Sequence, residues 1–533
     1  MIDFQRLKNC QISSELKDDD LHFWFNYKQQ KFLHNIDTLY YTVKLSNDFT
    51  KDTEDTAVLS FVNEYQRRKI TKTYQDLLSV SIPGIQNINF LPHMGQGFYN
   101  IWFEIPEYYD FIFASNVPMG KNGISVTPEI MVQIRSYALW MYGATKVFEK
   151  SFEVIKAICN YYGFEIIEVK ENRFDFCWHT NYIQNPDAYF SPLRLAKSQV
   201  SNFRRARVEF EYKPNDEVEY DYITHGKRND KIFLRIYLKS KEVTQKGYKP
   251  WFLMTWLLNG LISRYDFYIY EECYKESSWS KLDEMRLKFY LEYGTDKGIK
   301  AKISDYLEGR VSMSTKRISE LADYLTPRVT IIINIEYQVT RKAFKTFPIY
   351  PYSKDNFKKY GVASRMYDIF DNRFPITNYL TDSVFRLVET KEECMDMNKS
   401  RRPYTSFWKK LRSTKQVDVK IPKKQLDFTR IYNKKLNAEV MKRRVLNSAV
   451  VYGIYKKGIN SDDVLQDCAD ALMRLNDNDI ERMKAYKIKK SKKFNECELS
   501  GLIDEPSSET AYYVVNEDGE VINKYNNKND ESQ

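Results

Sequence analysis

The sequence predicts an α+β protein in which a sheet carries helices on one face. Residues 144–161 repeat apolar side chains at helical spacing. Residues 164–169 and 173–178 have the composition of strands, and residues 232–238 alternate apolar side chains with aromatic and polar ones. The resulting order of strand, helix and two further strands is typical of α+β proteins.

Residues 1–78 are charged, aromatic and ambiguous, with a helix possible over 54–72, and we expect a small appended element there. Turn residues follow from residue 79 onward. Strands are predicted over 98–105 and 130–135.

The helix predicted over 144–161 has an apolar stripe and a C-terminal cap. The stripe consists of Phe148, Phe152, Ile155 and Cys159. Gly163 stands where a C-terminal cap belongs. The polar triplet 170–172 is expected to be a turn that separates strands 164–169 and 173–178.

The second half of the predicted sheet is centred on the strand 232–238, which follows a basic turn at 225–231. A helix over 250–262, a strand over 264–270 and a helix region over 277–293 are expected next.

Further along, Ser314 is the expected N-cap of a helix over 314–326, and a strand is expected over 329–339. A basic segment covers 398–447, and a helix begins near 461. The expected divisions are 1–78 (appended element), 79–310 (sheet domain), 311–397 (extension), 398–486 (basic, mainly helical region) and 487–533 (disordered tail).

Composition favours a polyanionic partner and a reducing compartment. The net charge is +10 and the pI is about 8.8. Aromatic residues make up 15%, which suits base stacking and, equally, ordinary core packing. The seven cysteines form no CxxC pair, so free thiols are expected. Because no signal peptide or apolar run of membrane-spanning length is visible, we expect a cytoplasmic protein without a membrane partner.

The strand 173–178 presents the first candidate site. Side chains two residues apart share a face of a strand, which groups Arg173, Asp175, Cys177 and His179. Asp175 and His179 could then bind one metal ion. The alternative is a strand with an ordinary polar face.

The strand 232–238 and its exit present the second candidate site. Cations suit phosphate binding, and a carboxylate suits a metal ion that assists phosphoryl chemistry. The alternative is a solvated edge strand protected by lysines. The residues of interest are Lys227, Arg228, Arg235, Tyr237, Lys239, Lys241 and Glu242.

The segment 264–274 presents the third candidate site. On the expected strand, Arg264, Asp266, Tyr268 and Tyr270 share one face, and Asp266 adds a carboxylate. Tyr274 lies past the strand, where its phenol could attack a phosphodiester. The alternative is an aromatic strand in a chain that contains 41 tyrosines.

The basic segment 398–447 presents the fourth candidate site, an interface for DNA. Cations bind phosphates and interleaved aromatics stack on bases, while a solvated charged surface is the alternative. The cations of interest are Arg401, Arg402, Lys409, Lys410, Lys442, Arg443 and Arg444.

Taken in order, three of these segments resemble the Rep_trans family of rolling-circle plasmid replication initiators and related conjugative relaxases. The matching residues are Arg173-Phe174-Asp175, the run Leu234–Glu242 and Arg264-Tyr265-Asp266, within residues 80–295. His179 stands where the family often has a second Asp, and Asp266 stands where Glu is usual. Tyr274 lies about two residues short of the family's nucleophile, so Tyr270 is a rival.

The resemblance implies a five-stranded antiparallel nicking domain related to the HUH-like rolling-circle endonucleases. It implies a tyrosine nucleophile and a Mg²⁺ or Mn²⁺ ion held by Asp175, Glu242 and Asp266, with His179 as a further ligand. Arg235 and Lys239 would neutralise phosphates, and the remaining cations (Arg173, Lys227, Arg228, Lys241 and Arg264) would contact DNA.

The implied partners are double- and single-stranded origin DNA, a host helicase and a polymerase, with a homodimer left open. A conjugative relaxase, a non-catalytic origin-binding initiator and a structural assembly protein remain alternatives.

Overall fold

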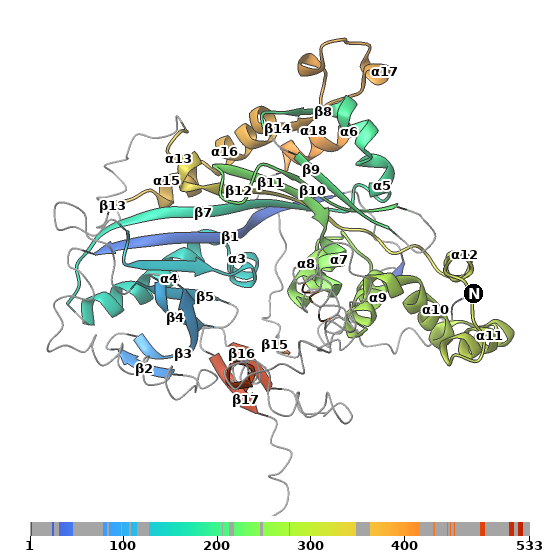
Figure 1. The fold of residues 1–533 in the computed structure, drawn as a ribbon, viewed down its shortest axis with the longest axis horizontal. Helices are drawn as coiled ribbons and strands as arrows, with labels where there is room; N and C mark the ends of the chain where they lie inside the picture. Colours follow the sequence, from blue (N-terminus) through green and yellow to red (C-terminus); the bar gives the residue numbers. More distant parts are fainter. Residues whose placement is uncertain are drawn as a thin grey trace, which may run out of the picture. The chain divides into compact units, whose positions relative to one another are not determined.

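The computed structural model describes a mixed helix and strand protein (Figure 1). The described residues are 2, 24–25, 31–45, 78–82, 85–96, 99–105, 108–114, 127–161, 163–204, 206–212, 218–245, 249–276, 278–347, 363–414, 430–431, 445, 448, 452, 480–484, 511–515 and 521–525. The chain forms two compact units. The first comprises residues 1–60, 81–87 and 94–426, and the second comprises 61–80, 88–93 and 427–533.

The first unit is built on a large sheet in which nine strands follow the order β4-β5-β6-β1-β7-β12-β11-β10-β9. Every neighbouring pair in this series is antiparallel. The strands are β1 (Phe32–Leu45), β4 (Tyr99–Ile105), β5 (Tyr109–Phe113), β6 (Ile130–Ile134), β7 (Ile166–Thr180), β9 (Ala206–Tyr212), β10 (Val218–His225), β11 (Ile232–Leu238) and β12 (Ile333–Thr340). The antiparallel sheet that the resemblance implied is therefore present, but it has more than the five strands expected.

Further strands and the helices complete the list of elements. The further strands are β2 (Leu78–Ile82), β3 (Ile85–Gln96), β8 (Gln199–Ser201), β13 (Ala363–Ser364) and β14 (Phe385–Leu387). The helices are α3 (Ser136–Tyr142), α4 (Ala144–Tyr161), α5 (Pro186–Tyr189), α6 (Pro192–Ser198), α7 (Lys239–Gln245), α8 (Pro250–Leu258), α9 (Arg264–Lys275), α10 (Leu282–Tyr293), α11 (Lys297–Leu307), α12 (Thr315–Leu325), α13 (Arg341–Phe344), α15 (Met366–Asp371), α16 (Arg373–Tyr379), α17 (Lys391–Cys394) and α18 (Ser406–Ser413). Single turns of other helix types are η2 (Trp279–Lys281), η3 (Leu380–Val384) and η4 (Lys399–Arg401).

β1 lies at the centre of the sheet. It pairs with β6 on one side and along almost its whole length with β7 on the other. The expectation that residues 1–78 form an appended element is therefore wrong for 32–45. Both faces of β1 are mostly buried, so it lacks the alternation of apolar and polar residues that marks a half-exposed strand.

Helices cover both faces of the sheet, which corrects the expectation of helices on one face only (Figure 1). On one face, His179 of β7 stacks on Trp140 of α3 and contacts Trp256 of α8. On the other face, Phe174 of β7 packs on α13 and α15 through aromatic contacts. We call the first of these, which carries Asp175 and His179, the charged face.

β7 is one continuous strand of 15 residues, so the turn predicted at 170–172 is wrong. Its pairing with β1 shifts between Arg173, opposite Tyr40, and Glu171, opposite Tyr41. Asn172 is thus the extra residue of a β-bulge, which reverses the side-chain alternation and bends the strand. The polar triplet that resembled a turn marks this bulge.

Residues 264–270 belong to the helix α9, so the strand predicted there is wrong. Ser263 caps this helix, and its hydroxyl accepts a hydrogen bond from the Asp266 amide. In return the Asp266 carboxylate accepts from the Ser263 amide at 2.8 Å. This reciprocal capping box starts a helix whatever strand-like alternation follows it.

Several local predictions are confirmed. α4 has the predicted bounds, and Gly163 follows it with φ of +75°. Ser314 caps α12 by accepting from the Arg317 amide. β11 also has its predicted bounds, and α7 begins at the next residue, Lys239, with no linker between them.

The second unit contains a small antiparallel sheet in the order β15-β16-β17. Its strands are Arg430–Ile431, Ala511–Val515 and Val521–Tyr525. Two of them fall in the tail for which the sequence predicted disorder. Lys442, Arg443 and Arg444 lie outside the described residues, as does most of the helix expected near 461.

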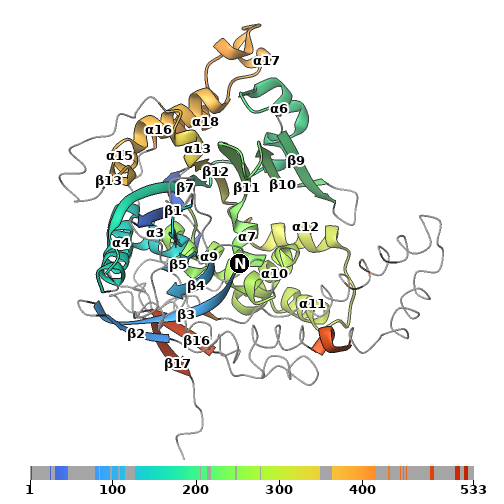
Figure 2. The ribbon, with the colours of Figure 1, turned by 60° about the vertical axis from the view of Figure 1, so that its left-hand side comes forward.

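Figure 2 turns the molecule by 60°. Among the described residues, no helix has the length and apolar character needed to cross a bilayer. The four described cysteines, Cys159, Cys177, Cys273 and Cys394, are free thiols.

Replacing Asp266 with alanine should destabilise the fold strongly. The carboxylate is fully buried and also accepts from the Thr330 amide and hydroxyl, both at 2.8 Å. Its loss leaves several buried donors unpaired, which we expect to cost about 3 kcal/mol or more in urea unfolding. Asp296 is the matched control, because it caps α11 at the surface and its alanine variant should lose only about 1 kcal/mol. A smaller loss for Asp266→Ala than for Asp296→Ala would contradict this account.

Candidate functional site

The charged face brings together groups from four neighbouring strands and from α7. Directly opposite residues in antiparallel strands share a face, so the pairs Cys177–Glu336 and Arg235–Glu336 place these three side chains in one row across β7, β12 and β11. The pair His179–Asn334 and the pair Asn334–Tyr237 form the adjoining row. The strand 232–238 therefore presents its polar side to a cluster of polar side chains, in which Arg235 stays 26% exposed.

Glu336 of β12 is the centre of one hydrogen-bonded network. Its side chain is 1% exposed and forms an ion pair with Arg235. Tyr237 donates to the second carboxylate oxygen at 3.2 Å, and Asn334 donates to the same oxygen at 3.2 Å. Burial alone would lower the pKa of Arg235, but Glu336 outweighs it and the pKa is raised. Arg235 thus balances a buried carboxylate, and sequence patterns did not identify Glu336 at all.

Lys239 is the centre of a second group, at the point where β11 becomes α7. Its ammonium lies 2.8 Å from Glu242 and 3.8 Å from Asp37, and the side chain is 2% exposed. Glu242 also pairs with Lys249 at 2.9 Å. Burial alone would raise the pKa of Glu242, but the two lysines hold it well below its usual range. Glu242 and Lys249, at 17% and 27% exposure, are the most accessible members of this group.

Asp37 of β1 is a site residue that the sequence reasoning missed. Besides Lys239, it accepts hydrogen bonds from the Ser136 hydroxyl at 2.5 Å and the Trp140 indole at 2.9 Å. Burial alone would raise the pKa of Asp37, but Lys239 outweighs it and the pKa is lowered. The sequence signal for this site residue was that Asp37 is the single acidic residue in the run 32–45, which mostly favours a β-strand.

His179 is held as a neutral core side chain. The Trp256 indole donates to its Nδ1 at 3.1 Å. Because an indole only donates, Nδ1 carries the lone pair and Nε2 carries the proton. Burial lowers the pKa of His179 to about 3, and Lys239 adds to the shift. Neither nitrogen has a lone pair left for a metal ion, so the predicted ligand role does not fit this arrangement.

Asp175 is fully buried and faces Arg173, which donates to it from Nε at 2.7 Å and again from Nη2. Burial raises the pKa of the Asp175 carboxyl, although Arg173 opposes the rise. Arg173 is also held over the Tyr40 ring at 5.2 Å. The predicted DNA contact of Arg173 is therefore replaced by an ion pair within β7.

The two candidate nucleophiles lie on α9 in different surroundings. Tyr270 is fully buried, and its hydroxyl donates to the Thr330 carbonyl. Burial raises the pKa of Tyr270 well above its usual value. Tyr274, one helical turn further on, is half-buried. Of the two, only Tyr274 has a side chain that reaches the surface.

The predicted DNA-binding cations divide into exposed and internal ones. Lys241 pairs with Asp221 at 3.2 Å, and Arg264 is 8% exposed, so both belong to the interior. Arg402 donates to three backbone carbonyls. The exposed residues are Lys227 and Arg228 in the β10–β11 turn, Arg401, and Lys409 and Lys410 of α18.

Two aromatics of the basic segment 398–447 belong to the core. Phe407 and Trp408 of α18 are fully buried, and the Trp408 indole donates to the Thr381 carbonyl at 2.7 Å. They are therefore not positioned to stack on bases, as the interleaved pattern had suggested. Lys409 and Lys410 remain available to an anionic surface.

The predicted metal ligands do not form one site. Among the described residues, no group of three or more His, Cys, Asp or Glu side chains is placed to hold a metal ion. Glu242 is paired with lysines and Asp175 with an arginine. Asp266 serves the α9 cap. These residues as arranged do not fit Mg²⁺ or Mn²⁺.

Comparison with known proteins does not assign this chain to a family. No family model and no curated protein matches the chain. A solved structure of the rolling circle replication initiator protein from Geobacillus stearothermophilus aligns with 72% of this chain and 96% of its own, at 12% identity and a TM-score of 0.31. A TM-score this low does not establish a shared fold.

Replacing His179 with phenylalanine should reduce the sensitivity of the fold to acid. The imidazole titrates near pH 6.5 when unfolded but has a pKa of about 3 when folded. Its contribution to stability is present above pH 6.5 and is lost as the pH falls toward the folded pKa. Between pH 7 and pH 5 the wild type should therefore lose about 2 kcal/mol more than His179→Phe in urea unfolding. Equal losses would show that His179 is protonated in the fold.

Proposed function

We propose that this protein is a replication initiator of a plasmid or other mobile element, which binds origin DNA and nicks one strand. One observation carries the proposal. Lys239 and Glu242, from the segment that resembles the Rep_trans family, meet Asp37 and Lys249 at the junction of β11 and α7. In this group of two cations and two carboxylates, Lys249 and Glu242 reach solvent, at 27% and 17% exposure.

The cations of this group suit a phosphodiester. Lys249 is the more exposed, at 27%, and would meet a phosphate first. Lys239 is held rigidly by three neighbours, including the Tyr237 hydroxyl at 3.3 Å. A preorganised charge of this kind stabilises the negative charge that develops on phosphoryl oxygens during transfer.

In this proposal Tyr274 is the nucleophile. Its phenolic oxygen gives up its proton and attacks phosphorus, and the bond from phosphorus to the 3′ oxygen breaks. The 3′ oxygen takes up a proton, and the phosphate stays on the tyrosine as a 5′-phosphotyrosyl ester. The free 3′-OH then primes a polymerase. The helix α9, which carries Tyr274, packs against α7, which carries Lys239 and Glu242.

A second candidate is an initiator that binds its origin without cutting it. It is favoured by the internal pairing of Asp175, Glu242 and Glu336, each of which already contacts a cation of the same chain. Such pairs hold a fold together without any ligand. This candidate predicts DNA binding without a covalent adduct.

The two candidates are separated by incubating the full chain with supercoiled origin DNA in Mg²⁺ or Mn²⁺ and mapping any covalent peptide by mass spectrometry. Nicking should yield an adduct on Tyr274, and Tyr274→Phe should abolish it while DNA binding persists. Tyr270→Phe should retain the adduct, because that hydroxyl is bonded inside the core. Binding with no adduct under any condition would exclude the nicking function and leave the second candidate.

Replacing Lys239 with alanine should lower the nicking rate at least about 100-fold, the usual cost of removing one preorganised charge. Lys316→Ala is the matched control, since it removes an exposed lysine from α12 and should leave the rate unchanged. Circular dichroism checks that Lys239→Ala still folds. A folded Lys239→Ala protein with the wild-type rate would place the chemistry elsewhere.

A further inference from the structure

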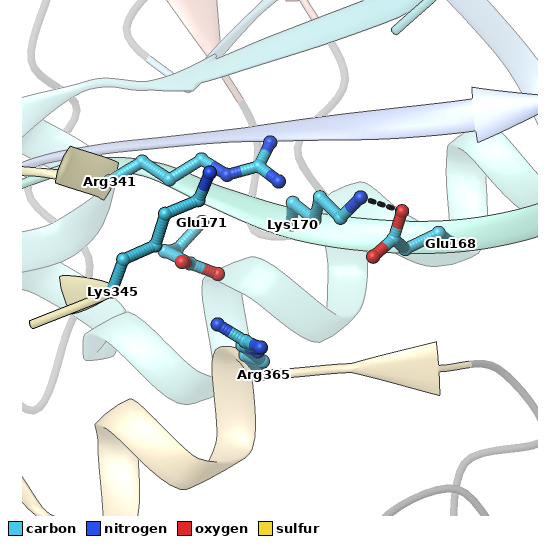
Figure 3. Close-up of a pocket in the computed structure, with 6 residues that line it drawn as sticks. All are labelled: Glu168, Lys170, Glu171, Arg341, Lys345 and Arg365. Carbon is cyan, nitrogen blue, oxygen red and sulfur yellow. Dashed lines mark ion pairs between the residues drawn. The ribbon is translucent and has the colours of Figure 1, made fainter. Parts of the chain in front are cut away.

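A cavity of about 410 Å³ lies where the bulged end of β7 meets α13 and the start of α15 (Figure 3). It is lined by Glu168, Lys170, Glu171, Arg341, Lys345 and Arg365. All six side chains are ionisable. A cavity of this volume is within the range of small-molecule sites, roughly 300–1,000 Å³.

The β-bulge at Asn172 creates this cavity. By reversing the alternation of β7, it turns Glu171 away from the charged face and toward α13 and α15. Arg341 is the first residue of α13 and directly follows β12, and Arg365 directly precedes α15. Figure 3 shows the Arg365 guanidinium directed toward the Glu171 carboxylate, whereas the ends of Arg341 and Lys345 lie above that carboxylate in the view.

Glu171 is the unusual member of the set. The residue is 1% exposed, and neither carboxylate oxygen has a hydrogen-bond partner on another of the described residues. Burial raises the pKa of Glu171, although its own backbone amide, Arg341 and Arg365 oppose the rise. A buried carboxylate without a donor is costly, so buried acceptors are normally satisfied.

The charges around the cavity favour an anion. Lys170 is paired with Glu168, as the dashed line in Figure 3 marks. The four cations and two carboxylates leave a formal charge of +2. A divalent metal ion would meet net repulsion here. A bare phosphate would match the positive charge of the cavity but would offer Glu171 no donor.

We propose that this cavity binds a nucleoside phosphate. The phosphate would lie among Arg341, Lys345 and Arg365, because guanidinium and ammonium groups match its charge and its acceptors. An amino group of the base or a sugar hydroxyl would donate to Glu171. The ligand could be a free nucleotide or one nucleotide of a DNA strand, and both present this chemistry. The proposal does not depend on strand nicking.

The test measures equilibrium binding of dAMP, inorganic phosphate and a short single-stranded oligonucleotide to the full chain by calorimetry. We expect dAMP to bind more tightly than phosphate. Arg341→Ala should weaken both at least about tenfold, the effect of losing one charged hydrogen bond. If the oligonucleotide competes with dAMP, the site accepts a nucleotide of a strand. If it does not, the site takes free nucleotides.

Glu171→Gln separates this proposal from a general anion site. The substitution removes a negative charge but keeps the shape, so phosphate should bind more tightly and the preference for dAMP should fall. Lys316→Ala on α12 is the control and should change neither affinity. An unchanged preference for dAMP in Glu171→Gln, or unchanged affinities in Arg341→Ala, would overturn the proposal. Because the readout is binding, this result stands apart from any outcome of the nicking assay.

Discussion

The pairing of charges on the buried charged face of the sheet is the constraint on which the rest of the structure depends. Asp175, Glu336 and Lys239 are almost fully removed from solvent, and each would be strongly destabilising without its partner. Asp175 is paired within its own strand, Glu336 is paired with the neighbouring strand, and Lys239 is paired within its own helix. A slip of one residue between β11 and β12 would turn Arg235 to the opposite face from Glu336. Charge pairing therefore fixes the register of the sheet as strongly as apolar packing does.

The same pairing makes the residue types of the charged face compatible with two roles, phosphoryl chemistry and internal neutralisation of charge. Cations and carboxylates that suit phosphoryl chemistry are also the residues that neutralise one another inside a protein. Lys249, Arg235 and Arg173 are 27%, 26% and 25% exposed, whereas Asp175, Glu336 and Lys239 are almost fully buried. A ligand would therefore meet the partly exposed cations of this face first.

Sequence patterns located the elements whose signals are local. The stripe of α4, the Ser314 cap and the alternation of β11 each depend on neighbours within a few residues, and all three are present. The sequence patterns failed where the local structure is decided by a contact with a distant residue or by reciprocal hydrogen bonds. The alternation in 264–270 is overridden by the exchange of hydrogen bonds between Ser263 and Asp266.

The site was only partly predictable for the same reason. The segment 234–242 was found because its residues are adjacent in sequence, and Lys239 and Glu242 do meet. Asp37 and Glu336 come from strands about 200 and 100 residues away, and only the pairing of β1, β7, β12 and β11 brings them in. The bulge at Asn172 was misread as a turn because polar residues mark both.

The direct passage from β11 into α7 has a consequence for chain length. With no linker after Leu238, the position of every α7 side chain is set by the count of residues from the sheet. One inserted residue would rotate the helix by about 100° and carry Glu242 away from Lys249. The exposed turn at 226–231 could absorb such an insertion. Insertions and deletions, more than substitutions, are thus what this junction cannot accommodate.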